Sequence, residues 1–248
     1  RLKLIIESKK KEEDLLITLK NLKFSNQELQ QFAYVASHDL QEPLRMVISF
    51  TQLLEKRYKD KLDKDANDFI HFAVDGAIRM KGLINDLLDY SRIITRREPL
   101  KKINFEKVLD DVILNLQMKI KETSAKISYD ELPSLMADRT QLMQLFQNLI
   151  SNALKFRSKK APQIHISAQH THNEWIFSVK DNGIGMEQRF LKKIFIIFQR
   201  LHTKDEYPGS GIGLAICKRI VDILNGRIWV ESEVGKGSTF KFAIPIKN

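Results

Sequence analysis

WIFSVKDNGIGM, residues 175–186, joins an alternating apolar stretch to a carboxylate and two glycines. In a β-strand successive side chains point to opposite faces, so every second residue from Trp175 to Asp181 shares one face. A carboxylate at the end of an apolar face is costly unless it has a hydrogen-bond partner. Gly183 and Gly185 allow the following backbone to turn and to approach a ligand closely. The stretch therefore predicts a strand that ends at a ligand site, with an ordinary strand and Asp-Asn-Gly turn as the alternative.

A helix predicted over residues 138–156 contains a second group of polar side chains. At 100° per residue, Asn148, Asn152 and Lys155 fall within about 60° of one another, beside the apolar stripe. Two amide oxygens and an ammonium suit a Mg²⁺-phosphate group. Taken alone, the same pattern also fits a solvated helix edge.

Glycine runs form the third and fourth signals. The run GSGIGL, residues 209–214, opens a helix predicted over residues 212–224, and free N–H groups at such a helix start bind phosphate. The spacing is neither that of a Rossmann fingerprint nor that of a Walker loop. The second run, GKG at residues 235–237, lies between two predicted strands, where a plain hairpin turn is the alternative.

The first 95 residues are predicted to form two long helices, over residues 1–60 and 64–93. Both carry apolar seams with alternating spacings of four and three, which is typical of coiled coils. A polar turn at 58–64 makes the pair an antiparallel hairpin. A single hairpin buries little apolar surface, so we expect two copies to form the four-helix bundle of a homodimer. The seams comprise Leu15, Leu19, Leu22, Asn26, Leu29, Ala33 and Ala36, then Ile70, Ala73, Ala77, Met80, Ile84, Leu87 and Ser91.

The pattern changes at residues 96–102, where we place a domain boundary. Beyond it, helical and strand patterns interleave, which indicates an α/β sandwich and an α+β chain overall. The predicted strands cover residues 125–130, 163–170, 174–181, 226–232 and 238–245, with a further helix over 105–121. The expected domains are a coiled-coil signalling helix (1–33), a helical hairpin (34–95), a linker (96–103) and an α/β domain (104–248).

Composition limits the class of protein. The 248 residues include one cysteine, Cys217, which excludes an internal disulfide and fits a reducing, cytoplasmic location. No apolar run approaches the roughly 18 residues needed to span a bilayer. The chain begins at Arg1 without a signal-peptide pattern, so we expect a fragment, with an upstream sensor or membrane anchor left open. The net charge of +10 is scattered over helices, and nucleic-acid binding is not expected.

The order of these motifs resembles the sensor histidine kinases of two-component systems. The run NLISNALKF (148–156) is similar to their N box, DNGIG (181–185) to the G1 box and GSGIGL (209–214) to the G2 box. The stretch VASHDLQEPLR (35–45) is similar to the H box, which carries the phosphoacceptor. The sequences SHDLQEPL (37–44) and RLH (200–202) resemble the phytochrome-like group.

The resemblance implies a Bergerat ATP-binding fold for the second domain, with ATP and Mg²⁺ as cofactors. Asp181 would accept a hydrogen bond from the adenine amine, Asn152 with Asn148 would hold Mg²⁺, and Lys155 would face phosphate. The remaining nucleotide-binding residues that it implies are Gly183, Gly185, Gly209, Gly211, Gly213 and Leu214.

The resemblance also answers what His38 does. From the helix alone it is a surface histidine, whereas the family makes it the nucleophile that ATP phosphorylates, with Asp39 orienting or deprotonating it. The phosphoryl group would then pass to an aspartate in the receiver domain of a response regulator. Glu42 stands where many relatives carry Thr or Asn, which puts phosphatase activity in doubt. The alternatives are an ATP-binding dimeric scaffold and an ATPase of the same superfamily, which would need a glutamate where this chain has Asn148.

Overall fold

The computed structural model describes residues 2–59, 61–95, 99–201, 206–207 and 209–246. Before residue 37 it describes only part of the side chains, and those of Ile94 and Thr95 are not among them. The chain divides into two compact units, Arg1–Ser91 and Arg92–Asn248. The expected boundaries of the four domains stay predictions.

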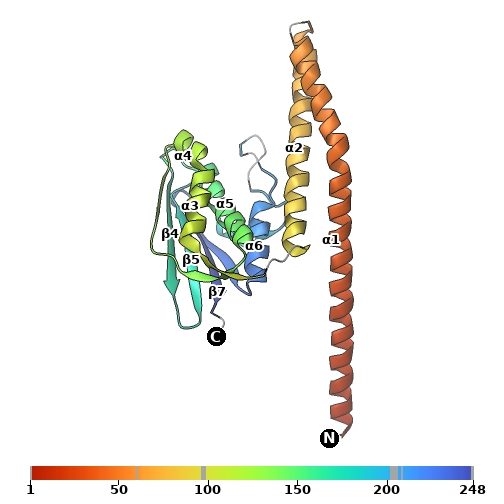
Figure 1. Ribbon diagram of the computed structural model, residues 1–248, viewed down its shortest axis with the longest axis vertical. Helices are drawn as coiled ribbons and strands as arrows, with labels where there is room; N and C mark the ends of the chain where they lie inside the picture. Colours follow the sequence, from red (N-terminus) through yellow and green to blue (C-terminus); the bar gives the residue numbers. More distant parts are fainter. Residues whose placement is uncertain (1, 60, 96–98, 202–205, 208, 247–248) are drawn as a thin grey trace. The chain divides into compact units, whose positions relative to one another are not determined.

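The first unit is a helical hairpin, as the sequence predicted (Figure 1). Helix α1 spans Leu2–Tyr58 and continues through Pro43, and helix α2 spans Lys64–Thr95. Proline removes one backbone donor, but a helix of this length retains the hydrogen bonds on either side of it. The polar turn ends at Asp63, whose carboxylate accepts a hydrogen bond from the backbone N–H of Ala66 at 2.8 Å. Asp63 therefore caps the start of α2.

The two helices pack through a small apolar cluster. Leu44 and Ile48 of α1 are buried with Ala77 of α2, and Ile84 packs against them. About one helical turn before Leu44, the side-chain amide of Gln41 donates a hydrogen bond to Asn85 Oδ1 of α2 at 2.8 Å.

Part of the predicted α2 seam is confirmed, because Ala77 and Ile84 lie in this packed cluster. Met80 was predicted for the same seam but is 52% exposed, whereas Val74, which was not predicted, is buried. The α1 seam beyond Leu15 lies outside the described side chains, so the coiled coil stays a prediction.

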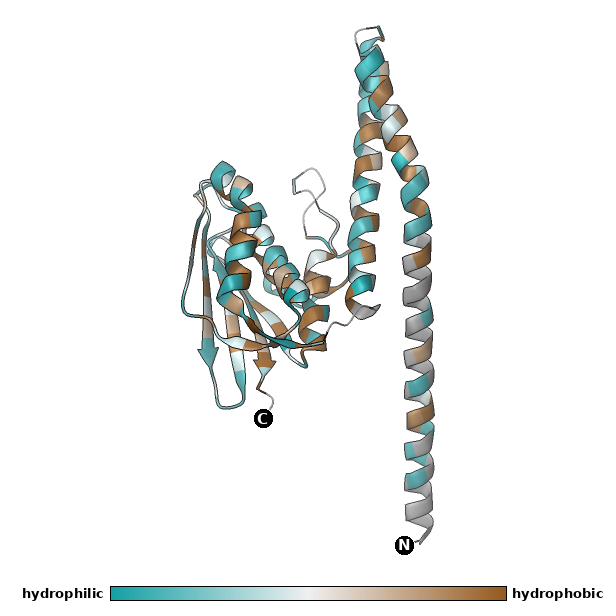
Figure 2. Cartoon of the chain, in the orientation of Figure 1, coloured by the Kyte–Doolittle hydropathy of each residue, from teal (hydrophilic) through white to brown (hydrophobic). Residues whose placement is uncertain are grey.

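The hairpin leaves much of its apolar surface uncovered. Figure 2 shows hydrophobic residues along both helices, and many of their side chains are exposed. Many large apolar side chains exposed on one element commonly mark a surface that another molecule covers. Within the hairpin after position 37, the large apolar residues that are more than half exposed are Leu40, Phe50, Leu53, Phe69, Phe72 and Met80.

The second unit contains a five-stranded sheet in the order β2-β4-β5-β7-β6. All neighbours in it are antiparallel except β2 and β4, which are parallel. The strands are β2 (Lys126–Tyr129), β4 (Gln163–His170), β5 (Glu174–Asp181), β6 (Arg227–Glu233) and β7 (Gly237–Pro245). Each corresponds to a predicted strand to within two residues at either end.

Two further strands were not predicted. Strand β1 (Lys101–Asn104) pairs antiparallel with β3 (Ser134–Ala137) as a separate two-stranded sheet. Strand β1 falls mostly within residues 96–103, which the sequence analysis took for a linker. Four residues that begin with two lysines carry too little apolar alternation to be recognised as a strand.

Helices cover one face of the five-stranded sheet (Figure 1). The single helix predicted over 105–121 is instead two helices, because the chain leaves helical geometry at Leu116, with φ −96° and ψ 3°. The helices are α3 (Phe105–Asn115), α4 (Gln117–Thr123), α5 (Arg139–Lys155) and α6 (Gly213–Ile223). Two short 3₁₀ turns, η1 (Gln188–Phe190) and η2 (Lys193–Phe195), precede α6.

Four phenylalanines join the helical layer to the sheet. Phe177 of β5 stacks on Phe242 of β7 and on Phe105 of α3, with ring centroids 4.8 and 4.9 Å apart. Phe146 of α5 meets Phe242 edge-on at 6.0 Å. All four side chains are fully buried. Aromatic pairs of this kind contribute beyond their buried area, so they stabilise the packing of α3 and α5 against β5 and β7.

Candidate functional site

Helix α5 carries the two asparagines and the lysine on its partly exposed edge. Its start is capped by Asp138, which accepts hydrogen bonds from the N–H groups of Thr140 and Gln141. Its buried stripe consists of Leu142, Leu145, Phe146, Leu149, Ile150 and Ala153. Since that stripe faces the sheet, the half-buried side chains of Asn148, Asn152 and Lys155 lie at its border, as the helical spacing predicted.

Asn148 shows an unusual hydrogen-bonding state. Its Oδ1 points toward the start of α6, where a Cβ on Gly213 would lie 3.3 Å from it. Its Nδ2 is buried beside the Cys217 thiol, and no oxygen or nitrogen of the described residues accepts a hydrogen bond from it within normal geometry. A buried amide without an oxygen or nitrogen partner costs stability and is a mark of functional sites.

Asp181 ends β5 beneath the helical layer and is 9% exposed. Its Oδ1 accepts two backbone hydrogen bonds, from Gly183 at 2.8 Å and from Ser238 at 3.1 Å. Burial raises the pKa of this carboxyl group, and the two N–H donors oppose that rise. With Oδ1 occupied twice, Oδ2 is the oxygen that is left to accept a hydrogen bond from a ligand.

The glycine turn after Asp181 is hydrogen-bonded to the residue that follows α5. The N–H of Ile184 donates to the carbonyl oxygen of Phe156, just past the end of α5, at 3.0 Å. A Cβ on Gly183 would lie 2.3 Å from the same oxygen, closer than real Cβ atoms come. Only glycine therefore fits at position 183.

The same turn also contacts the β6–β7 hairpin. Gly185 has φ +66°, and a Cβ there would lie 2.0 Å from the carbonyl oxygen of Glu233. The N–H of Gly235 donates to the carbonyl oxygen of Ile184 at 2.7 Å. Motifs about 50 residues apart in the sequence thus meet at one end of the sheet.

The GSGIGL run, residues 209–214, also contacts α5. A Cβ on Gly209 would lie 2.9 Å from Lys155 Nζ, and Gly211, with φ +79°, packs beneath Arg200. Helix α6 begins at Gly213 without a side-chain cap among the described residues, followed by the half-buried Leu214. Uncapped N–H groups at a helix start are a ready site for phosphate.

Lys155 lies beside the glycine run that leads into this helix, because a Cβ on Gly209 would lie 2.9 Å from its Nζ. Its Nζ lies 4.2 Å from the ring centroid of Phe156. Burial, and secondarily the charges of Arg200 and Lys119, lower the pKa of Lys155 to about 8. The ammonium is therefore poorly stabilised in the ligand-free protein, and a phosphate group would restore its preference for the charged form.

The histidine of the H box is placed on α1 with an acidic neighbour. His38 Nδ1 lies 3.2 Å from Asp39 Oδ1, and the two side chains are 71% and 72% exposed. Consecutive helical residues project about 100° apart, so this contact depends on both side chains leaning toward each other. It leaves the second ring nitrogen, Nε2, directed away from the carboxylate.

Comparison with known proteins agrees with this arrangement. Residues 28–96 match the family described as "His Kinase A (phospho-acceptor) domain". Residues 137–248 match the family described as "Histidine kinase-, DNA gyrase B-, and HSP90-like ATPase". The chain is 58% identical over 226 residues to "Cyanobacterial phytochrome A" of Nostoc sp., covering 91% of the chain and 30% of that relative.

The chain belongs to the sensor histidine kinases, in their phytochrome-like group. A second relative, "Phytochrome-like protein Cph1" of Synechocystis sp., is 50% identical over 236 residues, covering 95% of the chain and 32% of the relative. The kinase chain thus spans about a third of the length of these two curated relatives. The solved structure of full-length ShkA in complex with AMPPNP resembles it with a TM-score of 0.66 and 27% identity, covering 87% of this chain and 45% of that one.

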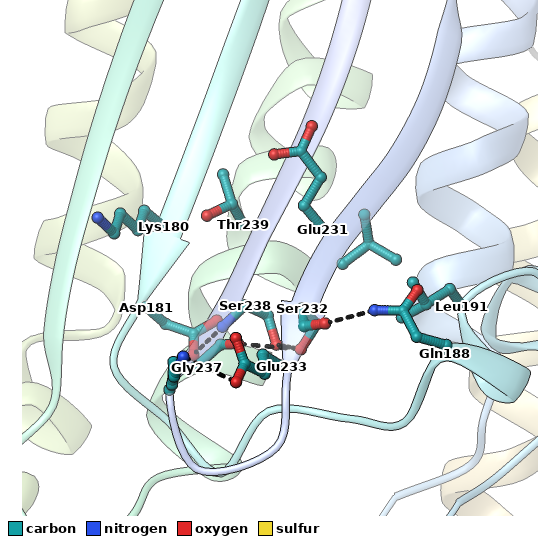
Figure 3. Close-up of a pocket in the computed structure, with 12 residues that line it drawn as sticks. Lys180, Asp181, Gln188, Leu191, Glu231, Ser232, Glu233, Gly237, Ser238 and Thr239 are labelled. Atoms are coloured by element: carbon teal, nitrogen blue, oxygen red, sulfur yellow. Dashed lines mark hydrogen bonds and ion pairs between the residues drawn. The ribbon is translucent and has the colours of Figure 1, made fainter.

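A cavity of about 410 Å³ lies beside Asp181 and the GKG run of the kinase (Figure 3). Its lining includes Asp181, but not the asparagines of α5 or the 209–213 glycines. Lys180, Glu231 and Thr239 also line it, and strand alternation places them on the sheet face away from the helices. We therefore do not assign this cavity to the phosphates.

Two polar residues beside Asp181 were missed by the sequence analysis. Ser238 donates its N–H to Asp181, and its hydroxyl lies 2.9 Å from that of Ser232. Ser238 directly follows the GKG run, which is the one sequence signal that would have identified it. Ser232 is paired with Ser238 across β6 and β7, and that register is visible only in the fold.

None of the helices in the described residues combines the length and apolar character needed to cross a bilayer. In the same part of the chain, no cluster of three or more His, Cys, Asp or Glu side chains is arranged to hold a metal ion. A metal bound by this kinase through asparagine and phosphate oxygens would not depend on such a cluster.

Proposed function

We propose that this chain transfers the γ-phosphoryl group of ATP to His38 and then to an aspartate in the receiver domain of a response regulator. The observation that carries the proposal is the 3.2 Å contact between His38 Nδ1 and Asp39 Oδ1 on an exposed helix. A contact between two side chains this exposed adds little stability, so a catalytic role accounts for it better than a structural one.

The contact selects the reactive nitrogen. When Nδ1–H donates to Asp39, the lone pair of the ring resides on Nε2, which becomes the nucleophile. A bond forms between Nε2 and the γ-phosphorus as the bond to the β–γ bridging oxygen breaks, and ADP leaves. The positive charge that develops on the ring is stabilised by the Asp39 carboxylate, which also accepts the Nδ1 proton. Phosphoryl transfer otherwise needs mainly alignment and charge neutralisation.

The second unit binds the nucleotide. Asp181 Oδ2 accepts a hydrogen bond from the adenine amine, because Oδ1 is already engaged by two backbone donors. Lys155 and the uncapped start of α6, with Gly213 and Leu214, bind the phosphates, and the 183, 185, 209 and 211 glycines allow close backbone approach. The AMPPNP complex of ShkA supports ATP as the nucleotide.

Mg²⁺ fits the donor set of α5. Asn148 and Asn152 lie one turn apart on the same helix edge and offer amide oxygens, which are suitable ligands for this hard cation. The Oδ1 of Asn148 faces the start of α6, where a Cβ on Gly213 would lie 3.3 Å from it, so this oxygen lies beside the predicted phosphate site. When bound, Mg²⁺ neutralises phosphate charge.

The uncovered apolar face of the hairpin supports the homodimer. Two copies that paired through residues such as Leu40, Phe69 and Phe72 would remove their exposed surface from water and complete a four-helix bundle. His38 and the nucleotide residues lie in separate units, so transfer requires the γ-phosphate to be presented to His38. A cytoplasmic location remains part of the proposal.

The test is labelling of the chain with γ-³²P ATP and Mg²⁺. His38→Gln should abolish an acid-labile, base-stable label while nucleotide binding persists. His71→Gln is the matched control, because His71 is also an exposed hairpin histidine and lies 3.4 Å from a carboxylate, that of Glu55. It should label like the wild type.

A label that survives in His38→Gln, or that is lost in His71→Gln, contradicts the assignment of the nucleophile. Release of inorganic phosphate without any protein-bound label would instead favour the ATPase alternative. Adding candidate receiver domains to the labelled chain tests the second transfer, which should move the label to the receiver.

A further inference from the structure

The hydroxyl of Ser232, near the end of β6, lies at the centre of a polar cluster beside Asp181. It accepts a hydrogen bond from the N–H of Met186 at 2.9 Å. It also lies 2.9 Å from the carbonyl oxygen of Gly237 and 2.9 Å from the hydroxyl of Ser238. Figure 3 shows the side chains of this cluster gathered at the ends of β5, β6 and β7.

The number of protons in this cluster fixes the direction of each hydrogen bond. Ser232 has one hydroxyl proton, and the carbonyl oxygen of Gly237 can only accept. Ser232 therefore donates to Gly237, and Ser238 must donate to Ser232. The opposite direction would leave two acceptor oxygens facing each other at 2.9 Å, with the buried Gly237 carbonyl deprived of this donor.

This direction determines what Ser238 can offer a ligand. Its hydroxyl proton is directed to Ser232 and its N–H to Asp181, so only oxygen lone pairs remain. The N–H of Gly183 is likewise engaged by Asp181. The donors described around the carboxylate are thus occupied internally, and the free groups are Asp181 Oδ2 and the Ser238 oxygen. Ser238 is 7% exposed, so water does not readily replace a missing partner.

We propose that Ser232 is a positioning residue that determines base specificity. By holding the Ser238 proton it makes the recess around Asp181 an acceptor-only surface, which favours the amine of adenine over the carbonyl of guanine. The inference rests on the proposed function, because it requires Asp181 to receive the base. Ser232 itself acts only through Ser238.

The test measures the dissociation constants of MgATP and MgGTP for the whole chain by calorimetry. In Ser232→Ala the Ser238 hydroxyl loses its acceptor and can turn its proton toward a base carbonyl. The preference for ATP over GTP should fall about tenfold, mainly through tighter GTP binding. Ser232→Thr keeps the hydroxyl and should restore the preference. Ser178→Ala, on the opposite face of β5, should leave both constants unchanged.

A purely structural role for Ser232 would weaken both nucleotides by the same factor, and an unchanged ratio would overturn the inference. If Ser232→Ala does not fold, as judged by thermal melting, Ser238→Ala replaces it. That variant removes an acceptor and should weaken ATP more than GTP, so equal losses would again overturn the inference. Failure of the wild-type chain to bind either nucleotide would overturn the proposed function as well. Normal ATP binding with an unchanged ratio would overturn this inference alone.

Discussion

Lys155 makes nucleotide affinity depend on pH in a direction that can be calculated. Burial, assisted by Arg200 and Lys119, lowers the pKa of Lys155 to about 8 in the free chain. A bound triphosphate stabilises the ammonium and raises its pKa, so ATP binds preferentially to the protonated form. Affinity should therefore be nearly constant below pH 8 and should fall as the pH rises above it.

The magnitude follows from the fraction of Lys155 that is protonated. With a free-chain pKa of about 8, the dissociation constant for MgATP should rise about eightfold from pH 7.5 to pH 9, and at least about threefold after allowance for solvent screening. At pH 8, binding should take up about half a proton per nucleotide. The γ-phosphate is already fully ionised over this range, so it does not contribute to the slope.

Calorimetry in buffers of different ionisation enthalpy measures both the dissociation constant and the proton uptake. Lys155→Arg is the matched control, because a guanidinium stays charged throughout the range while the other groups are retained. It should bind MgATP with little pH dependence and without proton uptake. A flat profile in the wild type, or the same slope in Lys155→Arg, would refute the argument that this lysine faces the phosphates.

Two other substitutions test the adenine end of the site. Asp181→Asn should weaken ATP binding roughly 10- to 100-fold by calorimetry, because an amide places a donor where the adenine amine needs an acceptor. The melting temperature of this variant should change little, since the amide oxygen can still accept a hydrogen bond from Ser238. Unchanged ATP affinity would argue against the role of Asp181. Gly183→Ala should destabilise the second unit by about 1–3 kcal/mol in urea unfolding, because its Cβ would lie 2.3 Å from the Phe156 carbonyl oxygen. In Gly82→Ala a Cβ would meet nothing within 4 Å, so it should be neutral or slightly stabilising, and equal losses in both variants would contradict the steric explanation.

Much of the fold could be predicted because its signals are local. Apolar periodicity located both hairpin helices and all five strands of the main sheet, since 3.6- and 2-residue repeats reflect which face each element buries. It failed for β1 and β3, which carry little apolar alternation, although β2, with the same four residues in length, was located. It also failed for the helix predicted over 105–121, which breaks at Leu116, where only the folded chain shows the break.

The candidate site also has features that the sequence predicted and contacts that only the structure shows. The sequence alone identified Asn148, Lys155, Asp181 and the glycine runs, because their residue types and their order along the chain carry the chemistry. It placed His38 and Asp39 on one helix but left their contact undecided, since consecutive helical side chains diverge and only their rotamers bring Nδ1 to 3.2 Å from the carboxylate.

The tertiary structure decided which groups around Asp181 are already hydrogen-bonded. Ser232 and Ser238 are linked to Asp181 only through the pairing of β6 with β7 and of β7 with β5. Contacts between strands depend on register, and register is set by the burial of the whole sheet rather than by any local repeat. The residue types of the site could therefore be recognised from the sequence, whereas the direction in which the Ser232 and Ser238 hydroxyl protons point is a property of the folded sheet.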